Sequence, residues 1–438
     1  MPLTLALSPR AGRGDWRRAC LSLPDFPKNQ RLYIDVVRLC LAVATRFLLP
    51  AGVEKVAGRP DEGRAKLSGA IRSVDFAGIF RRLIPDRKSE DIRCRMSSTT
   101  MQAFVLTRYG GPDAAELRDV PRPRPARGEV LVRVHAAGLN PVDYKTREGM
   151  LKVVQRYPLP VVMGNELAGV VEALGEDVTS FKPGDRVFAR MPKEAMGGLA
   201  EYAVVPEQFL AKMPASIDFN TAAGVPLAGL TALQALRDEL HVDQGSRIFI
   251  PGGAGGVGTF AIQLAKWLGA EVTTTASPRG RALVEELGAD VVIDYTTERF
   301  EEQLRDMDGV FDLLGGETLM KSFGVVKRGG KVVSIAGMPE PETARKDLGR
   351  GLFLRSLFWL ASYRIRAVAR KHGVSYRYLF MHPDGADLAE LADLIETKAI
   401  RPVIDRVFPL KDVAQAFAYL ESGHAKGKVV VEIGSRSG

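Results

Sequence analysis

The strongest constraint on the fold is an alternation of strand and helix patterns between Ser246 and Gly337. Short runs rich in β-branched residues alternate with runs of helical period, in the order SRIFIPGG, GTFAIQLAKWLG, AEVTTTAS, RGRALVEELG, DVVIDY, ERFEEQLRD, GVFDLLG, LMKSFGVVK and GGKVVSIAG. Parallel strands need crossover helices, and this order supplies one after each strand. It therefore predicts a doubly wound parallel sheet.

A glycine-rich loop follows the first of these strands. Gly253, Gly255 and Gly258 in IFIPGGAGGVG satisfy the pattern G-x-G-x-x-G at the start of a helix. Glycines there permit a tight turn, close approach of a pyrophosphate, and close packing of helix on strand. The alternative, that the glycines only build a turn, is disfavoured by the strand before them and the helix after them. The loop predicts a dinucleotide site.

The end of the second strand indicates which dinucleotide binds. An NAD site places an acidic residue about 20 residues after the loop, but the sequence there is TTTASPRGR. Ser277 can hydrogen-bond to a 2′-phosphate, and Arg279 or Arg281 can pair with it. The alternative, that the arginines are merely solvated, is less attractive because cations oppose the dipole at a helix start. NADPH is therefore predicted.

Short strand patterns with Gly and Pro punctuation precede this region. GEVLVRVHAAGL, ELAGVVEALG and FKPGDRVFAR predict a β-rich, barrel-like domain from residue 101 to about 220. From about Asp387 the chain returns to a helix (LAELADLIETK), a strand (PVIDRVF), a helix (DVAQAFAYLES) and a strand (KGKVVVEI).

The charge argues against a nucleic-acid partner. The formal net charge is +9, but residues 1–100 hold 19 Lys and Arg against 10 Asp and Glu, whereas residues 101–438 hold 42 of each. A balanced remainder offers no electrostatic footprint for a polyanion. The three cysteines all precede residue 101, which excludes thiolate metal sites and disulfides from the rest of the chain.

Residues 1–95 alternate Arg-rich, Pro-rich and apolar pieces without a sustained period. We expect this segment to be disordered or a start-site artefact, with the biological start at Met96 or Met101. A mitochondrial-type presequence is the alternative, which the early Asp15 and Asp25 disfavour. The most apolar stretch, RLYIDVVRLCLAVATRFLLPAGV, carries too many charges for a membrane span.

From Met101 to Ile433 the chain resembles the medium-chain dehydrogenase/reductases, and within them the zinc-free NADPH:quinone oxidoreductases and the alkenal (enone) reductases. The matching runs include GLNPVDYK, GNELAGVVEALGEDVTSFKPGDRVFA, GGLAEYAVVP, GGAGGVG, KAIRPVIDRVFPL and AFAYLESGHAKGKVVV. The resemblance implies a GroES-like catalytic domain with a Rossmann domain inserted in it. The expected parts are an extra segment (1–95), the catalytic domain (101–224), the NADPH-binding domain (225–370, with an inserted apolar and basic helix near 351–371) and a return to the catalytic domain (371–438).

The resemblance also implies a metal-free site. Zinc-dependent relatives carry a metal-binding cysteine where this chain has Asn140, and a metal-binding histidine where it has Asn165 in GNE. A catalytic zinc needs about three protein ligands of nitrogen, sulfur or carboxylate type, and neither amide serves well.

Without a metal, the oxygen of a reduced enone or quinone needs preorganised hydrogen-bond donors. Asn140 and Lys145 are the predicted donors, and the Lys145 ammonium can hold both the cofactor ribose and the developing enolate. By resemblance, Lys145 lies where these reductases contact cofactor and substrate. Tyr144 is a possible proton donor that could instead face the core. The alternative for Lys145 is an ordinary surface lysine. Asp143 has the alternative role of capping backbone.

Further cofactor contacts are implied by the resemblance alone. They lie in the glycine loop, at the ends of the third and fifth strands of the parallel sheet, and near the C-terminus: Gly256, Val257, Tyr295, Ile335, Ala336, Gly337 and His424. His424 stands where many relatives have arginine, so its contact is expected to be weaker, and a solvent-facing histidine is its alternative.

The segment GLFLRSLFWLASYRIRAVARKHG is an insertion, expected to form one helix of about twenty residues. A basic amphipathic helix can rest on a membrane. However, the apolar residues are distributed almost completely around the axis of this helix, which favours burial. We therefore expect the helix to pack over the cleft and to line a pocket for a hydrophobic substrate.

Together these features predict a cytoplasmic NADPH-dependent reductase of quinones or α,β-unsaturated carbonyls, expected from the resemblance to be a homodimer. Two rivals remain. One is a non-catalytic NADPH-binding or redox-sensing protein. The other is an enoyl reductase for thioester-bound chains, whose carrier would need a basic patch such as Arg364, Arg366, Arg370 and Lys371.

Overall fold

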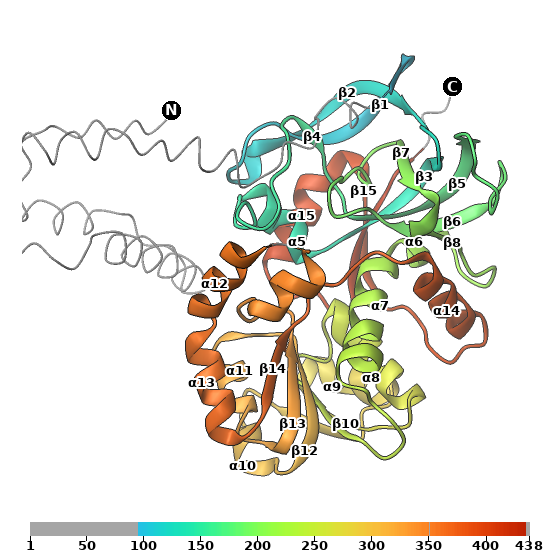
Figure 1. The fold of residues 1–438 in the computed structure, drawn as a ribbon. Coiled ribbons are helices and arrows are strands. Elements are labelled where there is room, and N and C mark those ends of the chain that lie inside the picture. Colours follow the sequence, from blue (N-terminus) through green and yellow to red (C-terminus); the bar gives the residue numbers. More distant parts are fainter. Residues whose placement is uncertain (1–94, 350, 435–438) are drawn as a thin grey trace, which may run out of the picture. The chain divides into compact units, whose positions relative to one another are not determined.

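The computed structural model describes residues 95–349 and 351–434, and its lower part in Figure 1 is built on a six-stranded parallel sheet. The strand order is β11-β10-β9-β12-β13-β14, and every neighbouring pair is parallel. This 3-2-1-4-5-6 order is that of dinucleotide-binding sheets, and it confirms the predicted doubly wound architecture. The strands are β9 (Arg247–Ile250), β10 (Glu271–Ala276), β11 (Val291–Asp294), β12 (Met307–Asp312), β13 (Val326–Ser334) and β14 (Ser375–Tyr378).

Helices bury both faces of this sheet. Ile248 and Ile250 of β9 pack in one apolar cluster with the helix that follows the glycine loop, whereas Phe249 packs in another cluster on the opposite face. The alternation follows from the two-residue period of a strand. The helices of this part are α7 (Pro226–Leu233), α8 (Gly256–Trp267), α9 (Pro278–Glu286), α10 (Phe300–Gln303), α11 (Gly316–Ser322), α12 (Leu352–Ala361) and α13 (Tyr363–His372).

The β-rich part confirms the GroES-like expectation. Its main sheet has the order β15-β16-β3-β5-β6-β8 with β7 on β3, and a smaller sheet has the order β2-β1-β4. The strands are β1 (Arg95–Leu106), β2 (Ala115–Arg124), β3 (Glu129–Leu139), β4 (Val161–Val162), β5 (Glu166–Leu174), β6 (Arg186–Arg190), β7 (Tyr202–Pro206), β8 (Leu210–Lys212), β15 (Ile404–Pro409) and β16 (Lys428–Glu432). Its helices are α5 (Pro141–Arg147), α6 (Phe219–Ala223), α14 (Gly385–Glu396) and α15 (Val413–Glu421).

The C-terminal strand β16 pairs antiparallel with β3, so the last segment returns to the sheet begun before the parallel domain. The parallel sheet itself continues to β14, beyond residue 370, where the sequence analysis ended that domain. The expectations for residues 1–94 lie outside the described residues.

Three local predictions need correction. The helix expected over LMKSFGVVK ends at Ser322, because β13 begins at Val326. The helix expected over ERFEEQLRD is the short α10. The insertion forms two helices that meet at Ser362, and the buried helix predicted there is wrong for α12, whose Leu352, Phe353 and Trp359 are exposed.

Candidate active site

Helix α5 carries the residues of the GLNPVDYK motif and begins where β3 ends. Asn140 is its N-cap and Pro141 occupies the first turn, where a missing N–H is tolerated. The Oδ2 atom of buried Asp143 accepts a hydrogen bond of 2.8 Å from the backbone N–H of Asn140. Asp143 therefore has the capping role considered as its alternative, and the capped start fixes the direction of the helix.

Lys145 lies on this helix, and its ammonium has no partner in the described part of the chain. The side chain is half-buried, and within residues 95–349 and 351–434 its ammonium makes no hydrogen bond or ion pair. Burial lowers the pKa of Lys145, and the nearby carboxylate of Glu148 opposes this shift in part. A partly desolvated ammonium without a protein partner can donate to an oxygen of a ligand.

Tyr144 is partly buried against the core of the β-rich domain. Burial, followed by the carboxylates of Glu148 and Glu421, raises the pKa of its phenol above the ordinary value. The phenol therefore keeps its proton at neutral pH, and its role as proton donor stays a prediction.

Behind α5 lies a buried group of polar side chains that the motif analysis missed. Lys428 at the start of β16 forms an ion pair of 2.8 Å with Glu166, and the two side chains are 3% and 0% exposed. The Lys428 ammonium also donates to Oδ1 of Asn140, whose Nδ2 donates to Glu166 over 2.6 Å. The only sequence signal was a charged residue inside each of the motifs GNE and GKVVV.

This network changes the expectation for Asn140. Both ends of its amide are engaged inside the protein, so at most the second N–H of the amide can reach a substrate. Its role as an oxyanion donor stays a prediction, and Lys145 is the stronger candidate.

The absence of a catalytic zinc stays a prediction, and the residues at this place bear on it. Asn165 donates from Nδ2 to Asp143 over 2.7 Å, and burial raises the pKa of Asp143 to about 6. Lys428 places an ammonium in hydrogen-bond contact with Asn140. The two carboxylates here, Asp143 and Glu166, already accept hydrogen bonds from the two amides, and the Lys428 ammonium would repel a divalent cation.

The glycine loop forms a cradle that only glycine permits. A Cβ on Gly253 would lie 2.2 Å from Oγ1 of Thr274, and one on Gly258 would lie 2.6 Å from the carbonyl oxygens of Gly252 and Gly253. Helix α8 starts at Gly256 with its first N–H groups at the loop. This arrangement fits a pyrophosphate against the helix N-terminus, and it also contains Gly255 and Val257.

The residues predicted to select NADPH lie at the ends of adjacent strands. Ser277 follows β10, and exposed Tyr295 follows β11, which pairs with β10 through Ala276 and Asp294. Arg279 on the first turn of α9 is exposed, and its guanidinium has no partner in the described part of the chain. These three residues fit a 2′-phosphate.

Arg281 differs from Arg279. Its guanidinium donates to the carbonyl of Val292 over 3.0 Å and pairs with Glu285. Lys426, which the sequence analysis missed, donates to the backbone carbonyl of Arg279 and adds a cation at this end of the site. His424 is exposed and contacts Ser422.

Arg279→Ala is expected to lower the preference for NADPH over NADH by about 10- to 100-fold, because a charge-assisted hydrogen bond contributes roughly 1.5 to 3 kcal/mol. Steady-state kcat/KM for both cofactors measures the ratio. Arg281→Ala is the matched control, because its guanidinium already has protein partners. A loss of preference in Arg281→Ala alone would contradict the assignment.

Ile335, Ala336 and Gly337 follow β13 and are fixed by Ser334. The Ser334 hydroxyl donates to Asp312 over 2.6 Å and accepts from the N–H of Gly337 over 2.8 Å. Like the glycine loop, this segment lies at the carboxyl edge of the parallel sheet, where ligands bind in such folds.

Backbone contacts connect the glycine loop to α5. The N–H of Gly427 donates to the carbonyl of Ala254 over 2.9 Å, and the next residue, Lys428, donates from its ammonium to the carbonyl of Leu139. Leu139 is two residues before α5. The start of β16 thus lies between the cofactor cradle and the helix that carries Lys145.

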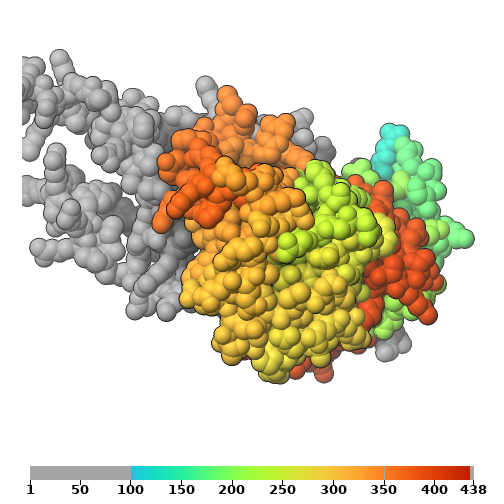
Figure 2. Space-filling view, turned by 90° about the horizontal axis from the view of Figure 1, so that it is seen from below, coloured from blue at the N-terminus to red at the C-terminus, as the bar shows by residue number. Residues whose placement is uncertain are grey.

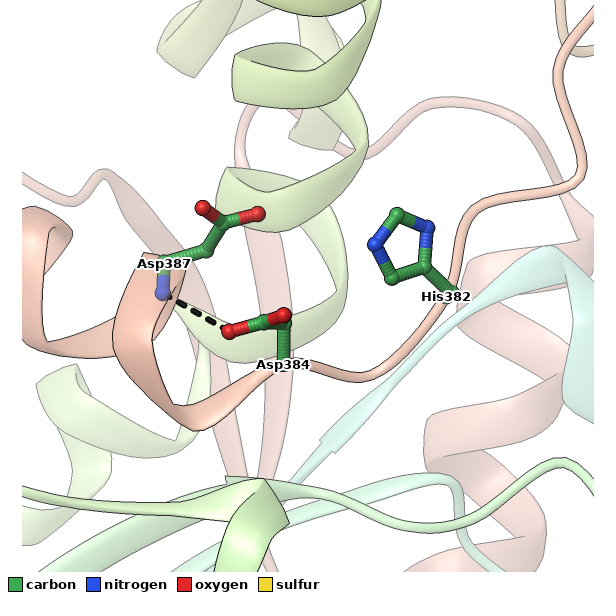
Figure 3. A group of neighbouring side chains, drawn as sticks. All are labelled: His382, Asp384 and Asp387. Carbon is green, nitrogen blue, oxygen red and sulfur yellow. Dashed lines mark hydrogen bonds between the residues drawn. The ribbon is translucent and has the colours of Figure 1, made fainter.

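A second cluster, His382, Asp384 and Asp387, has a spacing compatible with a metal ion (Figure 3). Its carboxylates already have protein partners. Asp384 caps α14 by accepting from the N–H groups of Ala386 and Asp387, and Asp387 pairs with Arg237 at 2.8 Å. The cluster therefore has a structural explanation and carries no functional assignment.

Comparison with known proteins identifies the family. A model of the alcohol dehydrogenase GroES-like domain matches residues 126–215, and one described as zinc-binding dehydrogenase matches residues 287–431. The NADPH-dependent alkenal/one oxidoreductase of Arabidopsis thaliana chloroplasts is 39% identical over 343 residues, covering 76% of this chain and 79% of that protein. The mitochondrial NAD(P)H oxidoreductase RTN4IP1 of Danio rerio is 36% identical over 362 residues, covering 76% and 92%. The chain belongs to the medium-chain dehydrogenase/reductases.

The solved structures agree with this assignment. The quinone oxidoreductase of Coxiella burnetii superposes with a TM-score of 0.67 at 33% identity, covering 77% of this chain and all of that chain. The predicted resemblance is therefore confirmed, together with the predicted fold class.

Proposed function

We propose that the protein is an NADPH-dependent oxidoreductase that reduces quinones, or the C=C bond of α,β-unsaturated carbonyls, without a metal. The observation that carries the proposal is the half-buried Lys145 ammonium, which has no partner in the described chain and lies on a helix connected to the cofactor cradle. The relatives named as alkenal/one oxidoreductase and as quinone oxidoreductase support this reaction class.

NADPH, when bound, supplies a hydride to an electron-poor carbon of the substrate. Negative charge then develops on the conjugated oxygen, and the Lys145 ammonium can donate a hydrogen bond to that oxygen. Burial makes this donor stronger because less water competes for it, as the lowered pKa of Lys145 indicates. Tyr144 retains a proton that can complete the reduction.

The two rivals receive less support. A non-catalytic binding protein needs no unpartnered ammonium on α5, and the named relatives are enzymes. An enoyl reductase for thioester-bound chains needs a carrier surface near the site. Arg364, Arg370 and Lys371 are exposed cations that could form such a carrier surface, but no contact or geometry among them is specific to a carrier protein.

Two further expectations accompany the proposal. A homodimer joined at the edges of the parallel sheets is expected from the family, and β14 is the available edge strand on one side. A cytoplasmic location stays a prediction, because the names of the relatives place them in mitochondria and chloroplasts.

The proposal predicts NADPH oxidation in the presence of a short enone or a benzoquinone, and none without an acceptor. Absorbance of the reduced nicotinamide measures the rate, with NADH as the paired cofactor. Tight binding of NADPH without turnover of either acceptor would remove the enzyme assignment and favour the binding protein.

A further inference from the structure

Helices α12 and α13 present an apolar surface to solvent. Leu352, Phe353, Trp359 and Tyr363 are 75%, 63%, 52% and 50% exposed, which are high values for such large side chains. Helix α13 lies beside β14, the edge strand of the parallel sheet, and α12 continues from the start of α13 (Figure 1). In Figure 2 the dark orange atoms of this part of the chain lie at the surface, on one flank of the parallel-sheet domain.

The same segment is strongly basic. Residues 351–373 contain five cationic side chains and no Asp or Glu: Arg355, Arg364, Arg366, Arg370 and Lys371. Arg355, Arg364 and Lys371 are exposed, and their side chains form no hydrogen bond or ion pair with residues 95–349 and 351–434. The segment therefore combines unpaired positive charge with exposed apolar and aromatic side chains.

The helices are anchored through their other face, so the exposed face is not a result of loose packing. Ile365 and Ala369 of α13 are buried in the apolar cluster on one side of the parallel sheet, and Phe358 of α12 is buried. Ser362 holds the junction of the helices by donating from Oγ to the carbonyl of Phe358 over 2.6 Å. Arg366 lies over the ring of Trp359, 5.4 Å from its centroid.

We propose that α12 and α13 form a docking surface for an anionic phospholipid bilayer. Leu352, Phe353 and Trp359 enter the interfacial region, and the surrounding arginine and lysine side chains contact the lipid phosphates. The docking is peripheral, since no helix in the described residues is long and apolar enough to cross a membrane.

A second copy of the chain is the other candidate for this surface, and its charge disfavours it. A two-fold interface centred on this patch, as distinct from one at the edge strand β14, would bring both copies of its five cations into one interface. Like charges at an interface are unfavourable, whereas an anionic bilayer is complementary to the patch.

The patch begins close to a contact between the β-rich part and the parallel-sheet part. Lys193, in the loop after β6, donates to the carbonyl of Asp347 over 3.1 Å, five residues before α12. The bilayer would thus contact the protein near the junction of its two domains. The docking proposal stands on the surface alone and does not depend on the proposed reaction.

The test is co-sedimentation of the full chain with vesicles of phosphatidylcholine, with and without phosphatidylglycerol. We expect binding to the vesicles that contain phosphatidylglycerol and loss of binding in high salt. Arg364→Gln with Lys371→Gln is expected to weaken binding at least tenfold, because each cation near an anionic surface contributes about 1 kcal/mol. Phe353→Ser with Trp359→Ser tests the apolar contribution and is expected to weaken binding to a similar degree.

Matched controls separate this surface from the rest of the chain. Lys398→Gln with Lys411→Gln removes two exposed cations elsewhere, and Trp267→Ser removes an exposed tryptophan of α8. All variants must keep the far-ultraviolet circular dichroism and the unfolding midpoint of the wild type. If a double variant in α12 and α13 does not keep the wild-type circular dichroism or unfolding midpoint, each of its two side chains is replaced singly.

Unchanged binding of both α12–α13 double variants would overturn the proposal, because the basic residues 1–100 would then account for binding. Equal binding to neutral vesicles would overturn the role of the cations. If the variants abolish self-association of the chain in sedimentation velocity and leave vesicle binding intact, the surface belongs to a second copy and not to a bilayer.

Discussion

Lys145→Met is expected to lower kcat for an enone or a quinone by about 100- to 1,000-fold, the effect of removing one preorganised donor from a developing oxyanion. Methionine keeps the length and apolar packing of the side chain and removes only the charge and the donors. Lys152→Met is the matched control, since Lys152 is an exposed lysine that lies over the ring of Tyr109 in the same region. Equal kcat values for the two variants would contradict the assignment of Lys145 as the donor to the substrate oxygen.

The pH profile gives a second readout for Lys145. If its charged form donates to the substrate oxygen, kcat/KM falls as the pH rises through its pKa, which burial lowers below that of a free lysine. Lys145→Arg stays charged at every accessible pH. It should therefore shift the alkaline limb to higher pH while retaining part of the activity. If the decrease of kcat/KM at high pH occurs at the same pH in Lys145→Arg, an ionisable group other than Lys145 causes that decrease.

Lys428→Met is expected to lower the free energy of unfolding by about 3 to 5 kcal/mol, because it leaves the buried Glu166 carboxylate without its cation. Denaturant titration measures the change. Lys428→Met combined with Glu166→Leu removes both charges and should recover much of the loss, since a buried pair replaced by apolar groups is often neutral. A double variant no more stable than the single variant would contradict this explanation.

A surface ion pair provides the control for Lys428. Lys266 and Asp290 are 2.8 Å apart, with 34% and 44% of their side chains exposed. Lys266→Met should therefore change stability by less than about 1 kcal/mol, as is usual for solvent-exposed pairs. A loss as large as that of Lys428→Met would show that burial is not the cause.

The sequence located the candidate site better than it located the surfaces around it. The glycine loop, Ser277 and the strand ends were predictable, because each depends on local turn chemistry placed at the carboxyl edge of a parallel sheet. The insertion was mispredicted because apolar residues around a helix indicate burial only when another element covers them. In the described residues, Leu352 and Phe353 remain exposed.

The sequence by itself determined the parallel sheet, the cofactor cradle and the family, because strand and helix periods and glycine positions are local properties of the chain. Only the tertiary structure decided which charged groups are used inside the protein. Lys428 meets Asn140 across 288 positions and Glu166 across 262, and no local pattern specifies such contacts. The same holds for the arginines of α9: partners from β11 and from the helix itself occupy Arg281, whereas the guanidinium of Arg279 has no partner in the described residues and stays the predicted contact of a phosphate.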